Sequence, residues 1–324
     1  MNEFELIERF FAAPPRSRSV RVGVGDDAAV IAPSPGHELV VSVDMLVAGR
    51  HFYADADPES VGHKALAVNL SDMAAMGARP RWALLAGALP DAREDWISAF
   101  ARGFLTLAHA HEVDLVGGDT TRGPLNLCVT IMGEVPEGLG MLRSGACSGD
   151  DIYVSGELGD AALALAALEG RTRLDAAELA RCRERLERPQ PRVALGLALR
   201  DVAHAGLDVS DGLTGDLAHI LERSGGGAVI DIAAIPRSAV LAQKLDSAER
   251  ELALACVLSG GDDYELCFTA PVQRRGRIDA IAREQGCALT RIGRIIDART
   301  ITWRDEHGVS ITPPRGFDHF ADSP

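Results

Sequence analysis

The pattern of apolar and polar positions divides the chain into short strand-like runs and longer helical segments. Runs rich in β-branched and apolar residues predict strands, because such side chains suit a pleated surface. In the first half, strands are expected at 38–44, 82–89 and 125–135. Residues 113–121 are expected to form a strand that enters a glycine-rich acidic turn. Apolar residues at helical spacing predict helices at 3–11 and 95–111.

The stretch from Gly62 to Gly77 differs from these helices because apolar residues lie on almost every side of it. It has no internal Gly or Pro between residues 64 and 76, and Gly77 stands where a helix end favours a left-handed residue. We therefore predict a buried helix. Asn69 and Asp72 are expected to share one of its faces. A buried carboxylate is costly unless it is paired, so Asp72 is either a satisfied core acid or a functional one.

The pattern changes near residues 136–140, where Pro and Gly interrupt the chain, and we place a domain boundary there. The predicted domains are 1–137 and 138–324. In the second domain, helices are expected at 160–168, 175–186 and 193–205, and strands at 228–232, 289–295 and 300–303. A short strand around Asp208 runs into a helix, for which Ser210 or Asp211 is the expected N-cap residue.

Composition indicates an ordinary globular enzyme rather than a membrane protein or a nucleic-acid-binding protein. The 324 residues are 47% hydrophobic, yet no apolar run is long enough to span a bilayer. The net charge of −14 lacks the basic excess that a nucleic-acid partner requires. The six cysteines form no C-x-x-C pair and no zinc spacing, so we expect reduced thiols scattered through the core of a cytoplasmic protein.

Acidic residues recur where glycine-rich turns meet strand ends. They are Asp26, Asp27, Asp44, Asp119, Asp208, Asp211, Asp262 and Asp263. Each of them alone is explained by a turn or a cap. If several converge with Asp72, each pair of charges about 4 Å apart repels by roughly 4 kcal/mol at an effective dielectric of about 20. Such a cluster requires cations, and oxygen donors suit Mg²⁺ better than zinc. Because Mg²⁺ commonly bridges phosphates, we expect metal-assisted phosphate chemistry.

Several well-known catalytic and nucleotide-binding motifs do not occur in the sequence. It has no G-x-x-x-x-G-K-[ST] phosphate loop, and no H-R-D or D-F-G kinase motif. Gly23 and Gly25 precede a strand and lack the third glycine of a dinucleotide fingerprint. The phosphate chemistry must therefore use a different scaffold.

Seven stretches, in order along the chain, carry a resemblance to a known family. They read VGVGDDAAV (22–30), VSVDMLVAGRHF (41–52), GHKALAVNLSDMAAMGARP (62–80), VGGDTTRGP (116–124), LRSGACSGDDIYVSGELGD (142–160), DVSDGL (208–213) and SGGDDYEL (259–266). Together they resemble the thiamine-monophosphate kinase family, within the superfamily of aminoimidazole ribonucleotide synthetase. The resemblance implies an α/β (α+β type) fold, with an N-terminal mixed-sheet domain for metal and ATP binding and for dimerisation. A C-terminal α/β domain would complete the active site.

The same resemblance implies transfer of the γ-phosphoryl group of ATP to thiamine monophosphate in a homodimer that uses several Mg²⁺ ions. The implied metal positions are Asp27, Ser42, Val43 (through its carbonyl), Asp44, Asp72, Asp119, Asp208 and Asp211. The implied nucleotide positions are Gly118, Asp119, Arg143 and Ser210, and the substrate positions are His51, Asp262 and Phe317. The implied catalytic residues are Asp44, Asp72, Asp119 and Arg143. The family commonly has Glu in place of Asp262, whose side chain is one methylene shorter.

Two alternatives of different classes remain open at this stage. The first is another ATP-dependent enzyme of the superfamily, similar to aminoimidazole ribonucleotide synthetase. The second is a non-catalytic nucleotide- or metal-binding protein of the same fold. Complete retention of the acidic residues argues against the second alternative, because converging carboxylates without a use cost stability.

Overall fold

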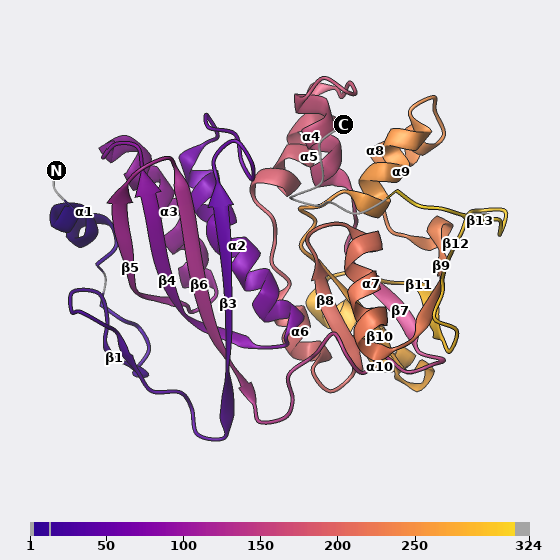
Figure 1. Ribbon diagram of the computed structural model, residues 1–324, viewed down its shortest axis with the longest axis horizontal. Helices are drawn as coiled ribbons and strands as arrows, with labels where there is room; N and C mark the ends of the chain where they lie inside the picture. The colour runs from indigo at the N-terminus through magenta and orange to yellow at the C-terminus, as the bar shows by residue number, and fades with distance from the viewer. Residues whose placement is uncertain (1–2, 13, 315–324) are drawn as a thin grey trace. The chain divides into compact units, whose positions relative to one another are not determined.

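The structure is a computed structural model that describes residues 3–12 and 14–314 (Figure 1). The chain forms two compact units, one of residues 1–73 and 78–140 and one of residues 74–77 and 141–324. The helices are α1 (Glu3–Phe10), α2 (Pro58–Ala75), α3 (Glu94–Ala110), α4 (Asp160–Leu168), α5 (Ala176–Glu187), α6 (Val193–Leu199), α7 (Leu213–Ser224), α8 (Ala239–Leu245), α9 (Arg250–Ser259) and α10 (Arg275–Gln285). The strands are β1 (Val20–Val22), β2 (Val30–Ile31), β3 (His37–Val47), β4 (Arg79–Leu89), β5 (Asp114–Arg122), β6 (Asn126–Pro136), β7 (Asp151–Ser155), β8 (Ala205–Val209), β9 (Gly227–Asp231), β10 (Glu265–Ala270), β11 (Leu289–Ile296), β12 (Ile301–Arg304) and β13 (Ser310–Ile311).

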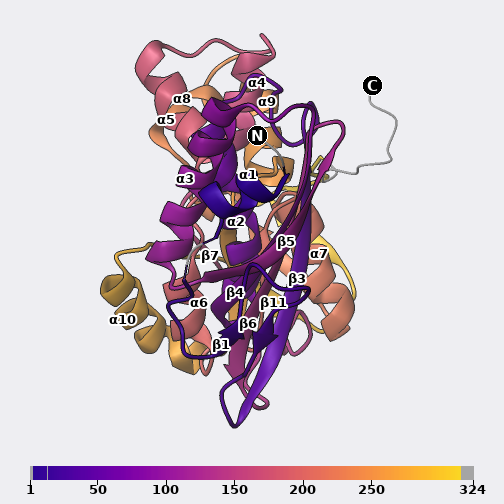
Figure 2. The ribbon, with the colours of Figure 1, turned by 90° about the vertical axis from the view of Figure 1, so that its left-hand side faces the viewer.

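The first unit is built on a four-stranded mixed sheet in the order β3-β6-β4-β5, with α2 and α3 on one face (Figures 1 and 2). The β4–β5 pair is parallel, and the other two pairs are antiparallel. Side chains alternate along β3, so that Ser42 and Leu46 lie on the face that carries the helices. The opposite face of β3, which we call the open face, exposes Leu39, Val41, Val43 and Met45 by 45–58%. One face of the sheet is therefore covered, and the other presents apolar side chains.

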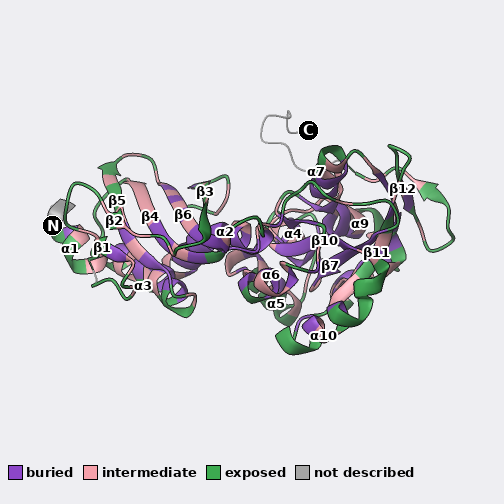
Figure 3. Cartoon of the chain, turned by 90° about the horizontal axis from the view of Figure 1, so that it is seen from below, coloured by how far each residue is buried: buried purple, intermediate pink, exposed green. Residues whose placement is uncertain are grey.

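Helix α2 is buried on almost all sides, as predicted (Figure 3). It begins at Pro58, earlier than the predicted start at Gly62. Asp57 accepts hydrogen bonds from the N–H and the hydroxyl of Ser60, so an Asp–Pro pair starts the helix in the usual way. Gly77 follows the helix with φ of +61°, which confirms the expected left-handed termination.

Helices α2 and α3 approach each other through two glycines. A Cβ atom added to Gly62 would lie 2.1 Å from the carbonyl oxygen of Phe100, and one added to Gly103 would lie 1.9 Å from that of Glu59. These separations are far below van der Waals contact. Glycine at both positions therefore sets the distance at which α3 covers α2.

The second unit contains a seven-stranded sheet in the order β13-β12-β9-β11-β7-β10-β8. Its pairs are antiparallel except for the parallel pair β9–β12. Every residue of β7, β8 and β10 is buried, which requires cover on both faces of that part of the sheet. This sheet and the mixed sheet of the first unit confirm the predicted α/β (α+β type) fold class.

Several predictions of local structure and burial are wrong. Residues 117–119 do not form a turn but continue β5, because they pair with β4. The helix predicted to reach residue 205 ends at Leu199, and β8 begins at Ala205. Four cysteines are buried as expected, whereas Cys128 is half-buried and Cys147 is exposed. Within residues 3–12 and 14–314, no helix is both long and apolar enough to cross a bilayer.

The close approach of α2 and α3 makes the substitution Gly62→Ala destabilising. The added methyl group must push the helices apart, and such overpacking costs about 1–3 kcal/mol or more. Gly276→Ala in α10 is the matched control, because nothing lies within 4 Å of its Cβ position. It should be neutral or gain up to about 1 kcal/mol from helix propensity. Urea denaturation measures both, and equal effects of the two substitutions would contradict the account.

Candidate functional site

Strand β3 and helix α2 bring Ser42 and Asp72 into contact. The Ser42 hydroxyl donates a hydrogen bond of 2.5 Å to Oδ2 of Asp72. Asp44 follows Ser42 by two residues on the same strand, so its side chain lies on the same covered face. Val43 stands between them, with its side chain on the open face. The structure thus places four predicted metal positions on one edge strand and the helix beside it.

Two other polar residues of α2 are buried close to Asp72 in the sequence. The amide nitrogen of Asn69 donates to the Ala65 carbonyl at 3.0 Å, but its Oδ1 has no hydrogen-bond partner among the described residues. An unsatisfied buried oxygen costs about 1–3 kcal/mol. Lys64 directs its ammonium group to the carbonyl of His51, at 3.4 Å. Besides the carboxylate of Asp72, the helix therefore carries a second oxygen atom that could coordinate a cation, Oδ1 of Asn69.

His51, a predicted substrate residue, has its ring fixed by the turn that follows β3. The ring atom Nδ1 accepts a hydrogen bond of 3.0 Å from the backbone N–H of Val47. The backbone N–H of His51 donates in turn to the Val47 carbonyl. An imidazole nitrogen that accepts a hydrogen bond carries no proton, so the ring proton lies on Nε2. His51 therefore offers an N–H donor at Nε2 in the neutral state.

A second group of acids in the first unit lines a pocket of about 920 Å³. Asp26, Asp27, Gly118 and Asp119 contribute to this pocket, together with apolar side chains of α1, α3 and β4. All three carboxylates are exposed. A Cβ on Gly118 would lie 1.8 Å from the Leu85 carbonyl oxygen, so only glycine allows β5 to pass β4 at this point. The pocket thus joins the predicted metal and nucleotide positions 27, 118 and 119.

The register of the sheet separates these two groups of acids. Residues paired across strands point to the same face. One row is Asp44, Val129, Leu85 and Gly118, and the next is Met45, Cys128, Ala86 and Asp119. Asp119 therefore lies on the open face, opposite to Asp44. Among the described residues, no three of the predicted metal-binding carboxylates place their oxygens within 4.8 Å of one another.

In the second unit, β8 carries Asp208, and the short turn that leads from β8 to α7 carries Ser210 and Asp211. Asp208 is buried at the end of β8, and Asp211 is exposed. The predicted capping by Ser210 or Asp211 is wrong, because the N-cap residue is Gly212. Instead, the backbone N–H groups of Ser210 and Asp211 both donate to the Asp216 carboxylate, at 3.0 and 3.1 Å. The turn is therefore fixed from within α7.

Asp216, in the first turn of α7, holds this turn and was not predicted from the sequence. Burial raises the pKa of Asp216 to about 7, and the negative charge of Asp208 raises it further. The hydrogen bonds that Asp216 accepts from the two backbone N–H groups lower the pKa and so oppose this rise. Its only signal in the sequence is an acid within the first turn of a helix, which is also a common surface position. Its role is to position Ser210 and Asp211.

The loop before β10 lies against this turn and holds Asp262. The N–H of Asp262 donates to the Ser210 carbonyl at 2.9 Å, and the Tyr264 hydroxyl donates to the Asp262 carboxylate at 2.9 Å. Asp262 has φ of +67°, a conformation that non-glycine residues adopt at a cost. A Cβ on Gly261 would lie 2.5 Å from the Ser210 carbonyl oxygen. The second unit thus brings Ser210, Asp211 and Asp262 together.

Two further acids of this loop have structural roles. Asp263 is buried and accepts the N–H of Gly159 at 2.8 Å, while its Oδ2 has no partner among the described residues. Burial holds the pKa of Asp263 well above its usual range. Glu265 is enclosed by Ser155, Arg185 and Arg192. Not every acid in the stretch that carries the resemblance therefore belongs to the site.

Of the remaining predicted positions, Arg143 lies on a loop outside these clusters. Arg143 is exposed, and its carbonyl accepts a hydrogen bond of 3.3 Å from the Ser224 hydroxyl. Its guanidinium is thus presented to solvent on the loop before β7. Phe317 lies outside the described residues.

The chain matches two family models and is similar to known proteins over nearly its full length. The family model of AIR synthase related protein, N-terminal domain, matches residues 25–135, and that of the C-terminal domain matches residues 148–305. Thiamine-monophosphate kinase of Salmonella typhimurium is 45% identical, with 98% of each chain covered. A crystal structure of thiamine-monophosphate kinase from Stenotrophomonas maltophilia is 48% identical, covers 94% of this chain and 96% of its own, and has a TM-score of 0.86. The structure of AaThiL complexed with AMPPCP and TMP is 30% identical, with coverage of 94% and 93% and a TM-score of 0.78.

The buried carboxyl group of Asp263 makes stability depend on pH in a predictable direction. Because its pKa is raised in the folded state, the folded protein keeps a proton that the unfolded chain releases above about pH 4. The stability from this proton is complete below that pH and is lost as the pH rises toward the folded pKa, by up to about 1.4 kcal/mol per pH unit. Asp263→Asn cannot ionise and should therefore gain stability relative to the wild type as the pH rises from about 5 to 8.

Urea denaturation at several pH values measures this gain. Asp201→Asn is the matched control, because Asp201 is exposed in the same unit. Its difference from the wild type should stay nearly constant across the range. A difference for Asp263→Asn that does not change with pH would show that Asp263 is ionised in the fold.

Proposed function

Because the chain belongs to the thiamine-monophosphate kinase family, we propose that it transfers the γ-phosphoryl group of ATP to thiamine monophosphate and so forms thiamine diphosphate and ADP. The observation that carries the proposal is similarity to named kinases over nearly the full length of both chains. The solved relative that is complexed with AMPPCP and TMP agrees with these two substrates. An activity like that of aminoimidazole ribonucleotide synthetase is not favoured. Since the reaction consumes ATP, we place the protein in the cytoplasm.

The reaction requires charge neutralisation and positioning of the substrates, and it does not require a general base. The attacking group is a phosphate oxygen that is already ionised at neutral pH. The barrier is the approach of two polyanions, so positioning and electrostatic stabilisation supply the catalysis. A set of acids can serve such a reaction only with cations, because carboxylates alone would add to the repulsion.

We propose that Mg²⁺ ions supply this charge. The candidate metal ligands at the predicted positions are hard oxygen atoms. The buried Oδ1 of Asn69, which has no hydrogen-bond partner among the described residues, is consistent with a cation close by. The residues that would hold the ions are Asp27, Ser42, Val43, Asp44, Asp72, Asp119, Asp208 and Asp211. When bound, Mg²⁺ offsets the charge of the phosphate oxygens and of the leaving group.

The other positions would bind and orient the two substrates. Arg143, with an exposed guanidinium, offers a planar fork of donors for a phosphate of ATP. Gly118 lines the same pocket as Asp27 and Asp119 and would contact the nucleotide there, and Ser210 lies on a turn that Asp216 fixes. His51 and Asp262 would contact thiamine monophosphate, His51 as a donor through Nε2 and Asp262 as an acceptor. Both have their backbone held by neighbouring chain segments.

We also propose that the protein is a homodimer in which the open faces of two sheets meet. Leu39, Val41, Val43 and Met45 form a continuous exposed apolar row on β3, which is unusual for a surface strand without a partner. A second copy of the same face is the natural cover, because a two-fold interface pairs a surface with itself.

A coupled assay of ADP formation tests the proposed activity. ADP should appear only when both ATP and thiamine monophosphate are present, and thiamine diphosphate should accumulate in equal amount. The control reaction replaces thiamine monophosphate with the precursor of aminoimidazole ribonucleotide. ADP formation with that precursor, and none with thiamine monophosphate, would overturn the proposal.

Asp72→Asn should lower kcat by roughly 100-fold or more, because it removes a charge that holds a cation while Asn can still accept the Ser42 hydrogen bond. The fold should be intact, as circular dichroism and the melting temperature would show. Asp91→Asn is the matched control, because Asp91 is an exposed acid of the same unit. Turnover of Asp72→Asn close to that of Asp91→Asn would remove Asp72 from the proposed metal positions.

Val41→Lys should convert the dimer into monomers. The lysine charge would have to be desolvated at the interface, and that costs several kcal/mol without a partner. Val309→Lys is the control, because Val309 is exposed to a similar extent, 59% against 55% for Val41, but lies outside the open face. Sedimentation velocity distinguishes the two species. A wild type that is monomeric at micromolar concentration would refute this interface.

A further inference from the structure

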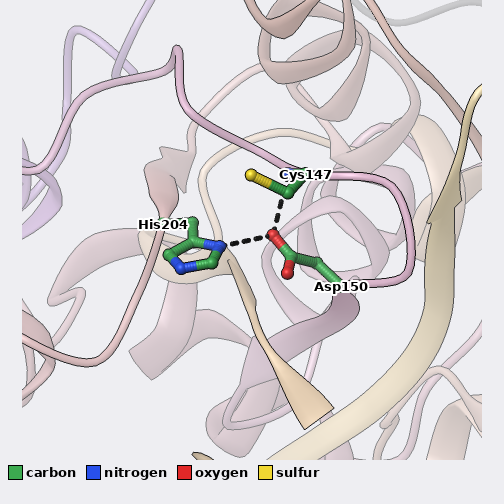
Figure 4. Close-up of side chains that lie close together, drawn as sticks. All are labelled: Cys147, Asp150 and His204. Carbon is green, nitrogen blue, oxygen red and sulfur yellow. Dashed lines mark hydrogen bonds and ion pairs between the residues drawn. The ribbon is translucent and has the colours of Figure 1, made fainter.

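A cluster of three metal-ligating side chains lies in the second unit among residues that the proposed reaction does not use (Figure 4). Cys147 and Asp150 belong to the loop before β7, and His204 immediately precedes β8. One ligand atom of each residue lies within 4.8 Å of those of the other two. Nδ1 of His204 and Oδ2 of Asp150 are 2.9 Å apart. Among the described residues, this is the only group of three such side chains that meets this limit.

The backbone around the cluster holds the three residues in place. The N–H of Cys147 donates to Oδ2 of Asp150 at 2.9 Å, and the N–H of Asp150 returns a bond of 3.0 Å to the Cys147 carbonyl. His204 is anchored by its N–H, which donates to the Thr269 carbonyl at 2.8 Å. The loop passes so close to His204 that a Cβ on Gly145 would lie 2.6 Å from the His204 carbonyl oxygen. The donor atoms are therefore positioned by the fold.

Burial differs between the three side chains in a way that suits an ion at the surface. The Asp150 side chain is 4% exposed, whereas that of His204 is 40% exposed and Cys147 is exposed. The carboxylate thus forms the floor of the cluster, and the thiol and imidazole form its rim. The thiol donates only a weak hydrogen bond, to the Gly145 carbonyl with Sγ–O of 3.4 Å. An ion at the rim would be accessible to solvent.

We propose that Cys147, Asp150 and His204 bind a borderline-soft divalent cation, with Zn²⁺ as the best fit. A thiolate and an imidazole favour Zn²⁺ over Mg²⁺, which prefers oxygen donors only. Zinc bonds of about 2.3 Å to sulfur and about 2.0–2.2 Å to nitrogen and oxygen place the ligand atoms roughly 3–4 Å apart, within the observed limit. Three protein ligands leave a fourth position for water or an external ligand.

The protons balance in a simple way. On binding, the Cys147 thiol releases its proton to solvent, and sulfur bonds to the metal as thiolate. Before binding, Nδ1 of His204 carries the proton that bonds to Asp150; on binding, this proton leaves to solvent while Nε2 takes up one from solvent, so that neutral His204 binds the metal through Nδ1. The carboxylate of Asp150 exchanges its hydrogen bond from His204 for a bond to the metal. No oxidant or reductant takes part, and the site is independent of the proposed Mg²⁺ positions.

Titration with Co²⁺ tests the proposal, because a cobalt–thiolate bond gives a charge-transfer band in the near ultraviolet that oxygen donors do not give. The full-length protein is titrated in excess Mg²⁺, which occupies hard oxygen sites, and Zn²⁺ affinity is then measured by displacement of Co²⁺. We expect about one equivalent of metal per chain and a clear thiolate band. Absence of the band in the wild type would overturn the proposal.

Variants assign the ligands. Loss of an outer partner of a metal site typically costs about 10- to 100-fold in affinity, so Cys147→Ser and His204→Ala, which remove direct ligands, should cost at least about 100-fold. Cys147→Ser should also abolish the thiolate band. Cys128→Ser and His307→Ala are the matched controls and should leave affinity and band unchanged. Cys147→Ser and His307→Ala should melt as the wild type does without metal, since both residues are exposed. His204→Ala also removes a hydrogen-bond partner of the buried Asp150 carboxylate and should melt at a lower temperature. A band that persists in Cys147→Ser would show that another cysteine is the ligand.

Discussion

A helix that is apolar on all sides has to be enclosed, and the enclosure of α2 sets the geometry of the first unit. The sheet covers it from one side, and α3 approaches as closely as Gly62 and Gly103 permit. Burial on all sides leaves the polar groups of the helix few choices of partner. The Asp72 carboxylate finds the hydroxyl of Ser42 on β3, and the amide of Asn69 is left with one unpaired oxygen. The burial of α2 therefore directs the carboxylate of Asp72 toward the edge strand β3.

The remaining acids lie in separate groups, each with its own surroundings. In the first unit, the sheet separates the acids of β3 and α2 from Asp119, which lies on the open face. In the second unit, Asp208 lies near Asp216, and burial together with this neighbouring charge raises the pKa of Asp216 to about 7. The backbone of Ser210 and Asp211 stabilises that carboxylate in return. Asp72 and Asp216 are each held by hydrogen bonds within their own unit.

The sequence correctly predicted those elements that depend on the preferences of neighbouring residues. The apolar helix α2, the β-branched strand β3 and the glycine after α2 needed no knowledge of distant residues. The errors have non-local causes. Residues 117–119 look like a turn, but pairing with β4 keeps them in a strand. Ser210 and Asp211 do not cap α7; Gly212 is the N-cap residue, and the N–H groups of Ser210 and Asp211 donate to the carboxylate of Asp216. Cys147 and His204 lie far apart in the sequence, and only the closely packed loop at Gly145 brings them together.

The central claim is that the acids of this kinase family member are cation-binding groups. Its most direct test is the melting temperature of the wild-type protein in millimolar Mg²⁺, with and without ATP, against NaCl at equal ionic strength. Ligands that bind only the folded state stabilise it by RT ln(1 + [L]/Kd), so Mg²⁺ should raise the melting temperature and Mg²⁺ with ATP should raise it further. Equal melting temperatures in MgCl₂, in MgCl₂ with ATP and in NaCl would contradict the claim.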